Sequence, residues 1–466
     1  HRSLQVSGGG QDLRPDCAEM GGRKRPGTRC HGILYDLMLA RGVVSGRPRV
    51  ALHARNLHRQ TRAAVQEGHK LAVDVVDLAP DTLEQGRGFR AGRALGRTVW
   101  HGERILAAAR PLGVATRRHA MPSRPPLALT MGDPVGVGPE VTARAAVDPR
   151  VLEIAVPIVV GDAAIVTRAA RACALDVHVR AAPSVDAAAR VVNATTIAVV
   201  APADRRDGHD NSLVDLPGGH VSPRAGDASV RYVVHAVDEA LAGRVAGIVT
   251  APINKEAINA AGHHFAGHTE LIAARTGTRE AAMMLTTGTL RVIHATTHVA
   301  FTRVPSLLTP ARLDEVIALL HATLLDLGCA TPRIAVAGLN PHAGEHGLFG
   351  TEESDVIAPA VARANVAGLD VTGPWPPDTV FPRAARGHFD GVVAMYHDQG
   401  HVAVKMLGFD EGVNVSLGLP IVRTSVDHGT AFDIAGKGIA SPISMIEATR
   451  LAATLSAARA HRNQHA

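Results

Sequence analysis

Short apolar runs that alternate with glycine-containing loops and alanine-rich stretches are the feature that most constrains the fold of this 466-residue chain. The runs are rich in Val and Ile and lack the polar alternation of a half-exposed strand, so they are typical of strands buried on both faces. The stretches between them have the length and composition of helices. The pattern predicts a mainly parallel α/β sheet covered by helices on both faces. The predicted strands are Val156–Val160, Thr196–Val200, Gly247–Thr250, Val292–Ala295, Ile334–Ala337 and Val392–Met395, and the helical stretches include Val141–Val147, Val230–Ala242 and Ala311–Leu327.

Charge divides the chain into two parts. Residues 1–120 contain 21 Lys and Arg against 10 Asp and Glu, whereas residues 121–466 contain 28 against 33. We expect residues 1–120 to be a basic extension of unknown role, either disordered or a remnant of a fusion or of upstream translation. A basic arm that binds nucleic acid is the alternative. Since this stretch has few aromatic side chains that could stack on bases, nucleic acid is not an expected partner.

Membrane insertion and secretion are not indicated by the sequence. No run of about 18 apolar residues occurs, and no charged segment followed by an apolar one opens the chain. The four cysteines are widely spaced and form no C-x-x-C pair, which favours the reducing cytoplasm over a disulfide framework or a thiolate zinc site.

In the sequence LALTMGDPVGVGPE, Leu127 to Glu140, a predicted strand runs into a glycine-rich loop at Gly132. Gly132 and Asp133 lie in this loop, and Pro139-Glu140 is a favourable helix start. Backbone N–H groups at a helix N-terminus can bind an anion such as a cofactor phosphate. A tight strand-to-helix turn without a ligand explains the spacing equally well.

Three histidines follow predicted strands directly: His298 in TTH, His342 in LNPHAGE and His397 in MYHDQGH. Ligands in parallel α/β sheets bind beyond the carboxyl ends of the strands, so these imidazoles are expected at one edge. Three imidazoles suit a borderline-soft divalent ion with an open coordination position. Structural histidines near strands are the alternative, because 18 of the 25 histidines lie beyond residue 120.

Lysine is rare after residue 120, where only Lys255, Lys405 and Lys437 occur among 28 basic residues. Lysine supplies a compact ammonium for a phosphate contact or a proton relay, which is one explanation for its retention at these positions. Residual codon drift is the other. Lys437 belongs to VDHGTAFDIAGKGIASP, a glycine-rich and polar stretch that has few residues suited to a core.

Together these motifs resemble the 4-hydroxythreonine-4-phosphate dehydrogenase family, from about Pro126 to the C-terminus. The matching stretches are TMGDPVGVGPE, TAPINKEAINAAGHHFAGHTE, TTH, GLNPHAGEHGLFGTEE, GPWPPDTVF, AMYHDQGHVAVK and GVNVSLGLPIVRTSVDHGTAFDIAGKG. The resemblance implies an isocitrate/isopropylmalate dehydrogenase-like fold, with two α/β/α subdomains and a cleft between them, over a catalytic domain at residues 121–466. It also implies a homodimer whose active site is completed by the partner subunit.

The resemblance assigns roles to particular residues. It implies substrate contacts for His268, Thr269, Lys405, Asn414 and Arg423, and a divalent metal, zinc before magnesium or cobalt, bound by His298, His342 and His397. Asp378 and Asp398 are expected to contact the substrate too, and Asp398 or Lys405 is the candidate proton acceptor. The cofactor is expected to be NAD or NADP. The likeness of the last stretch to a dehydrogenase cofactor loop, together with the glycine loop, gives the cofactor residues Gly429, Thr430, Asp433, Gly132 and Asp133.

The implied activity is oxidation of 4-phosphooxy-L-threonine followed by decarboxylation, as part of pyridoxal phosphate synthesis. The metal would lower the pKa of the substrate hydroxyl as hydride leaves. The sequence also resembles a branch that acts on D-threonate or D-erythronate 4-phosphate in sugar-acid catabolism. A three-histidine hydrolase of phosphate esters is a hypothesis of a different class, and it predicts phosphate release without NAD.

Overall fold

The computed structural model describes residues 124–202, 213–279, 281–408 and 410–465, which fall in one compact unit of the chain. The predictions for residues 1–120 lie outside the described residues. Twelve strands of this unit form one sheet in the order β3-β4-β2-β1-β5-β12-β11-β6-β7-β10-β8-β9. They are β1 (Pro126–Thr130), β2 (Val156–Val160), β3 (His178–Ala182), β4 (Thr196–Val200), β5 (Gly247–Thr250), β6 (Ala282–Thr287), β7 (Leu290–His294), β8 (Arg333–Ala337), β9 (Asp370–Trp375), β10 (Gly391–Ala394), β11 (Val413–Leu417) and β12 (Val422–Val426).

Parallel pairing holds at both ends of the sheet, and antiparallel pairing joins them. β3, β4, β2, β1, β5 and β12 are parallel neighbours, as are β7, β10, β8 and β9. Between these two sets, β12 with β11, β11 with β6, and β6 with β7 pair antiparallel. The sheet therefore has two α/β halves that share one continuous hydrogen-bond network.

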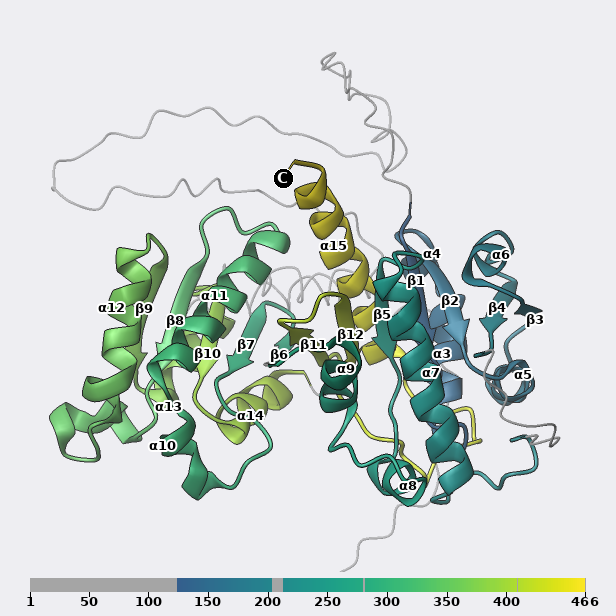
Figure 1. Cartoon of the computed structure of the whole chain (residues 1–466), viewed down its shortest axis with the longest axis horizontal. Helices are drawn as coiled ribbons and strands as arrows, with labels where there is room; N and C mark the ends of the chain where they lie inside the picture. Colours follow the sequence, from purple (N-terminus) through teal and green to yellow (C-terminus); the bar gives the residue numbers. More distant parts are fainter. Residues whose placement is uncertain (1–123, 203–212, 280, 409, 466) are drawn as a thin grey trace, which may run out of the picture. The chain divides into compact units, whose positions relative to one another are not determined.

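Helices cover both faces of the sheet (Figure 1). One layer consists of helices that contact one another in series: α5 (Ala163–Ala172), α3 (Gly138–Ala146), α15 (Ile443–His465), α11 (Pro310–Asp326) and α12 (Ala358–Val366). The other layer includes α6 (Val185–Ala189), α7 (Pro223–Leu241), α9 (His268–Thr276), α13 (Pro377–Ala385) and α14 (His397–Leu407). Shorter helices are α4 (Pro149–Leu152), α8 (Lys255–Ala260), α10 (Val304–Leu307), η1 (Phe301–Arg303), η2 (Pro341–Gly347) and η3 (Glu353–Ile357).

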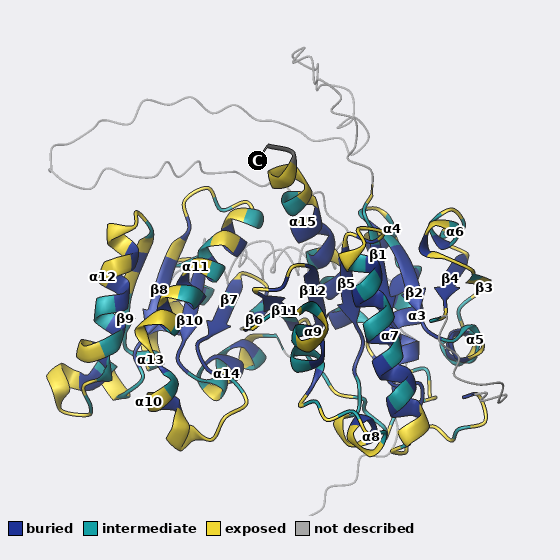
Figure 2. Cartoon of the chain, in the orientation of Figure 1, coloured by how far each residue is buried: buried dark blue, intermediate teal, exposed yellow. Residues whose placement is uncertain are grey.

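Alternate residues of a strand enter different cores, as expected for a sheet buried on both faces. On β10, Val393 packs in the cluster of α11 and α15, whereas Val392 and Ala394 pack in the cluster of α13 and α14. Inner strands such as β1, β5 and β10 are consequently dark blue in Figure 2, whereas the edge strands β3 and β9 are largely exposed or intermediate. This double burial is the physical reason that the strand sequences lack polar alternation.

Helix starts follow from local side-chain chemistry. Asp162, Ser222 and Thr309 are the N-cap residues of α5, α7 and α11, and each accepts a hydrogen bond from a backbone N–H of the first turn. Pro223 and Pro310 occupy the first helical positions of α7 and α11, where a missing N–H has no cost.

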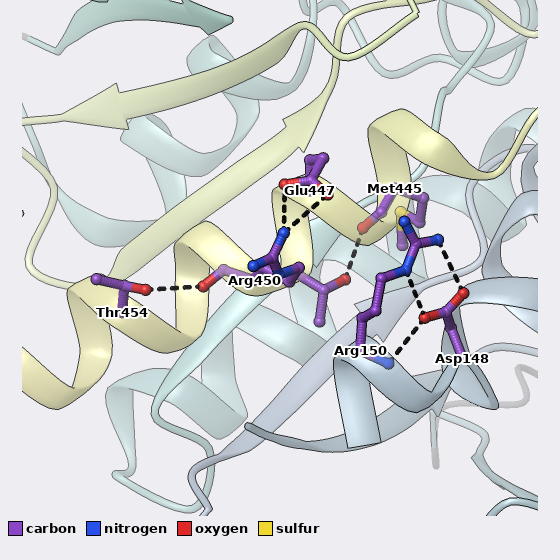
Figure 3. A network of polar contacts seen from close by, with 7 residues as sticks. Asp148, Arg150, Met445, Glu447, Arg450 and Thr454 are labelled. Atoms are coloured by element: carbon purple, nitrogen blue, oxygen red, sulfur yellow. Dashed lines mark hydrogen bonds and ion pairs between the residues drawn. The ribbon is translucent and has the colours of Figure 1, made fainter. Parts of the chain in front are cut away.

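Asp148 links the short helix α4 to the charges around it (Figure 3). Its Oδ1 accepts from the backbone N–H and Nε of Arg150, at 2.9 and 3.0 Å. The hydrogen bond from Arg150 holds the pKa of Asp148 below its ordinary value, and the charge of Arg450 on α15 acts in the same direction. Arg450 in turn pairs with Glu447 at 3.1 Å.

The α/β prediction is confirmed, and the predicted strands coincide with β2, β4, β5, β7, β8 and β10 to within two residues. The predicted helix at 230–242 begins seven residues earlier, at Pro223, because the Ser222-Pro223 start precedes its apolar positions. Across the part of the chain that the structure describes, no helix is long and apolar enough to cross a membrane.

Gly226 marks the closest approach of α7 and α8 and gives a test of the packing. A Cβ at this position would lie 2.2 Å from the carbonyl oxygen of Ala257, a backbone atom that cannot move alone. We expect Gly226→Ala to destabilise the protein by about 1–3 kcal/mol in urea unfolding. Gly218→Ala is the control, since its nearest atoms would be 3.9 Å away, and equal unfolding curves for the two variants would contradict the packing.

Candidate active site

Arg423 on β12 carries a buried charge at the centre of the sheet. The residue is 2% exposed, and its Nη1 and Nη2 donate to Ser416 Oγ and Thr250 Oγ1, both at 2.8 Å. Its Nε has no hydrogen-bond partner among the described residues. Burial lowers the pKa of Arg423 from 12.5 to about 10, so the guanidinium stays protonated at neutral pH. Because both bonded partners are neutral hydroxyls, this charge favours an anionic ligand.

Strand register explains how Arg423 reaches this place. It lies opposite Ser416 on β11 and beside Ile248 on β5, so Thr250, two residues further along β5, faces the same side of the sheet. Asn414, two residues before Ser416, faces that side too. Its Nδ2 contacts Met283 Sδ at 3.0 Å, and its enclosed Oδ1 has no partner in the described chain.

The start of α9 contributes His268, Thr269 and Glu270. Burial lowers the pKa of His268 well below 6.5, and the positive charges of Arg423 and Lys255 act in the same direction. The His268 imidazole is therefore neutral, and its enclosed Nε2 makes no hydrogen bond within the described residues. Glu270 Oε1 lies 3.8 Å from Nδ1 of His298, and this contact is the largest cause of the lowered pKa of Glu270.

Four imidazoles gather where β7 and β10 end. His298 and His397 have ring centroids 5.5 Å apart, and His401 stacks on His397 with centroids 3.6 Å apart. His294 lies 4.8 Å from His401 and contacts the carbonyl oxygen of Met283 through Nδ1 at 3.1 Å. Burial lowers the pKa of His294 to about 4 and that of His401 to about 3.

The three histidines predicted to bind a metal follow different strands. The described residues of this single chain contain no group of three His, Cys, Asp or Glu side chains that could hold a metal, so the assignment of His298, His342 and His397 stays a prediction. Residues 342–346 all have positive φ between 43° and 81°, so the segment after β8 is left-handed. His342 lines a cavity of about 540 Å³ together with Asp378, whose contact with the substrate also stays a prediction.

The two candidate proton acceptors differ in surroundings. Asp398 has a side chain that is 79% exposed, and its Oδ1 lies 2.6 Å from Nδ1 of His397, a hydrogen bond that lowers the pKa of Asp398. Lys405 Nζ lies 3.6 Å from Oδ2 of Asp427, whose side chain is 11% exposed. Burial raises the pKa of Asp427, and the ammonium of Lys405 opposes that effect.

Thr430, one of the predicted cofactor residues, contacts the start of α3. The backbone N–H of Val137 donates to the carbonyl oxygen of Thr430 at 3.0 Å, and a Cβ on Gly136 would lie 3.0 Å from Thr430. Gly429 and Asp433 are exposed on the same loop. Backbone that is lined by glycines and open to solvent in this way fits the phosphates and ribose of a dinucleotide.

Gly132 and Asp133 fix the backbone of the loop between β1 and α3. Gly132 has φ of +68°, and a Cβ there would lie 2.3 Å from the carbonyl oxygen of Pro252, so no other residue fits. Asp133 is fully buried, and its Oδ1 accepts from the N–H of Val135 at 3.0 Å. In this arrangement Asp133 holds the loop and has no surface to offer a cofactor.

Comparison with known proteins decides the family. The model of the family described as pyridoxal phosphate biosynthetic protein PdxA matches residues 153–452. A 4-hydroxythreonine-4-phosphate dehydrogenase of Desulforapulum autotrophicum is 46% identical over 71% of this chain and 95% of its own length. The chain belongs to the PdxA family. The D-threonate 4-phosphate dehydrogenase of Cupriavidus necator is also 46% identical, over 72% of this chain and 98% of its own.

A solved structure agrees with this membership of the PdxA family. The crystal structure of 4-hydroxythreonine-4-phosphate dehydrogenase from Klebsiella pneumoniae has 43% identity and a TM-score of 0.63, and it covers 72% of this chain and 98% of its own. The PdxA match spans the predicted substrate residues from His268 to Arg423, whereas Gly132 and Asp133 precede it.

Three polar residues of this PdxA-family site were missed by the sequence analysis. Glu270 and Asp427 stand in the quoted motifs GHTE and SVDHG, next to residues that were selected. His401 follows His397 by four residues, the spacing that places two side chains on one helix face, and this was a usable signal.

Asp133 makes stability depend on pH in a direction that can be tested. Burial raises its pKa from 3.8 to about 6, so the native state keeps a proton that the unfolded chain loses near pH 4. Stability is therefore lost as pH rises from 4 to 6, by up to about 3 kcal/mol. Asn cannot ionise, so Asp133→Asn should gain stability relative to wild type between pH 4 and pH 7 in urea unfolding.

Asp148→Asn is the control for this experiment, because the pKa of Asp148 is lowered whereas that of Asp133 is raised. Arg150 lowers the pKa of Asp148, so its carboxylate stabilises the fold above the unfolded pKa, and this stability is lost as pH falls. Asp148→Asn should lose stability relative to wild type as pH rises. If the free energies of unfolding of wild type and Asp133→Asn changed in parallel between pH 4 and pH 7, Asp133 would not be a buried, protonated carboxyl.

Proposed function

We propose that the protein is an NAD(P)-dependent dehydrogenase that oxidises 4-phosphooxy-L-threonine to 2-amino-3-oxo-4-phosphooxybutanoate. The product then decarboxylates to 3-amino-2-oxopropyl phosphate, within pyridoxal phosphate synthesis. The observation that carries the proposal is the buried guanidinium of Arg423, which is bonded to neutral hydroxyls and lies beside His268. Membership of the PdxA family and the dehydrogenase names of its relatives support the reaction type.

Each substrate contact has a physical basis in the chain. Arg423 supplies the charge that a phosphate or carboxylate requires, and its unpartnered Nε offers one further N–H. His268 is neutral, so its Nε2 can accept from or donate to the substrate without a charge penalty. Thr269 follows His268 at the start of α9, and Asn414 lies on the Arg423 side of the sheet, so they would add a hydroxyl and an amide.

Proton removal from the substrate hydroxyl is assigned to the Lys405–Asp427 pair rather than to Asp398. The pKa of Asp398 is lowered by its contact with His397, which makes its carboxylate a weak base. Asp427 is buried beside Lys405 at 3.6 Å, so the two groups can share and pass one proton. The nicotinamide, when bound at the Gly429–Asp433 loop, supplies the hydride acceptor.

Zinc dependence stays a prediction of the family resemblance. The described residues of the single chain contain no group of three metal-binding side chains, so no reaction step is derived through a metal. The resemblance predicts that exhaustive chelation abolishes NADH formation and that added zinc restores it. NADH formation at the wild-type rate after metal analysis has verified removal would exclude the metal.

A homodimer with a shared active site is the assembly that we propose. Large apolar side chains near the histidines in sequence are exposed, with Phe301 at 68%, Val402 at 61% and Met406 at 81%. Such a patch is typical of an interface. The molecular mass of the protein in solution tests this proposal, and a monomeric mass would contradict it.

The activity is tested by NADH formation from two substrates offered to the purified protein. If the proposal is right, 4-phosphooxy-L-threonine gives a kcat/KM at least tenfold above that of D-threonate 4-phosphate. The reverse ratio would assign the protein to the catabolic branch, which the equal identity of the Cupriavidus necator relative makes the second candidate. Phosphate release without NAD would instead indicate a hydrolase.

Arg423→Lys is the matched variant for this assay. It keeps the positive charge but cannot hold both Ser416 and Thr250 in the planar geometry of a guanidinium. We expect the KM for the phosphorylated substrate to rise at least tenfold. An unchanged KM would remove Arg423 from the substrate site.

A further inference from the structure

Glu140 on α3 holds the glycine-rich loop that follows β12, although it is remote from that loop in sequence. It is 2% exposed, and its two carboxylate oxygens accept from different backbone groups: Oε1 from the N–H of Gly436 at 2.5 Å and Oε2 from the N–H of Gly438 at 2.9 Å. Both oxygens are thus bonded to the loop backbone. Glu140 stands in the first turn of α3, where the helix dipole stabilises its negative charge.

Arg144, one helical turn further along α3, binds the same loop through its carbonyl groups. Nη1 donates to the carbonyl oxygen of Ala440 at 3.3 Å, and Nη2 donates to that of Gly438. Gly438 is therefore bonded on both its N–H and its C=O by side chains of one helix. Together with the bond from Val137 to Thr430, α3 fixes the backbone of the loop from residue 430 to residue 440.

Part of the loop is open to solvent. A Cβ added at Gly429 or Gly436 would meet no atom within 4 Å, and Asp433 and Lys437 are exposed, whereas Ala431, Ile434 and Ala435 pack against the core. A glycine-rich segment loses much conformational entropy when a ligand orders it. Hydrogen bonds that order it in advance reduce that cost at the moment of binding.

We propose that Glu140 and Arg144 are positioning residues, which preorganise the 429–438 loop for the dinucleotide without touching it. The inference rests on the proposed function, because it takes this loop as the cofactor site. It predicts that loss of either side chain weakens dinucleotide binding selectively. The phosphorylated substrate, which is assigned to Arg423 on the sheet, should be bound as before.

The test is the dissociation constant of NAD⁺, measured by calorimetry on the full chain without substrate. Gln at position 140 offers one acceptor oxygen in place of two, so Glu140→Gln leaves one loop N–H without its partner. We expect the dissociation constant to rise about tenfold, while the KM for the phosphorylated substrate changes less than twofold. Arg144→Met keeps the apolar stem and removes the two nitrogens that donate to the loop, so it should also raise the NAD⁺ dissociation constant. If Glu140→Gln does not fold, Arg144→Met tests the proposal in its place.

Glu239→Gln is the matched control. Glu239 on α7 is also buried, and its carboxylate is paired at 2.6 Å with Arg244, which follows that helix, so the variant loses a charged contact elsewhere. It should lower thermal stability without changing NAD⁺ binding. The positioning role would be overturned if folded Glu140→Gln and Arg144→Met bound NAD⁺ within twofold of wild type. It would also be overturned if the NAD⁺ dissociation constant and the KM for the phosphorylated substrate rose equally. Absence of NAD⁺ and NADP⁺ binding by wild type would overturn the proposed function as well.

Discussion

The position of β12 between β5 and β11 is the constraint on which the rest of the structure depends. β12 pairs parallel with β5 and antiparallel with β11, so a strand from the last tenth of the chain closes the sheet that the first described strands begin. The two α/β halves have separate apolar clusters for α7 and for α13 and α14. Without β12 they would share neither a hydrogen-bond network nor the surface on which Arg423 lies.

Burial of Arg423 is a cost that the fold tolerates at this strand. A guanidinium bonded to two hydroxyls is poorly compensated in a low-dielectric interior, which is why its pKa is lowered to about 10. Glu270 opposes that lowering and also contacts His298. The carboxylate of Glu270 thus acts on both the buried guanidinium and the imidazole of His298, and the proposed anionic substrate would add a further negative charge beside Arg423.

Local patterns in the sequence sufficed for the parallel sheet and for the strand-end position of the histidines, but not for the assembly of the site. Val392–Met395 could be predicted as β10 because double burial leaves an unbroken apolar run. The left-handed backbone that carries His342 could not be predicted. Just before it, the buried side chain of Glu353 accepts from the N–H groups of Leu339 and Asn340, both at 2.7 Å. Such contacts between a loop and a distant side chain leave no periodic signal.

One continuous segment, from β12 to the start of α15, serves both proposed binding sites. Arg423 lies in its strand, Asp427 contacts Lys405 as the strand ends, and three residues later Thr430 is bonded to the start of α3. The loop held by Glu140 and the proposed proton-transfer pair are therefore joined by a short piece of backbone. If both proposals hold, the cofactor and the reacting hydroxyl would be positioned by this single piece of chain.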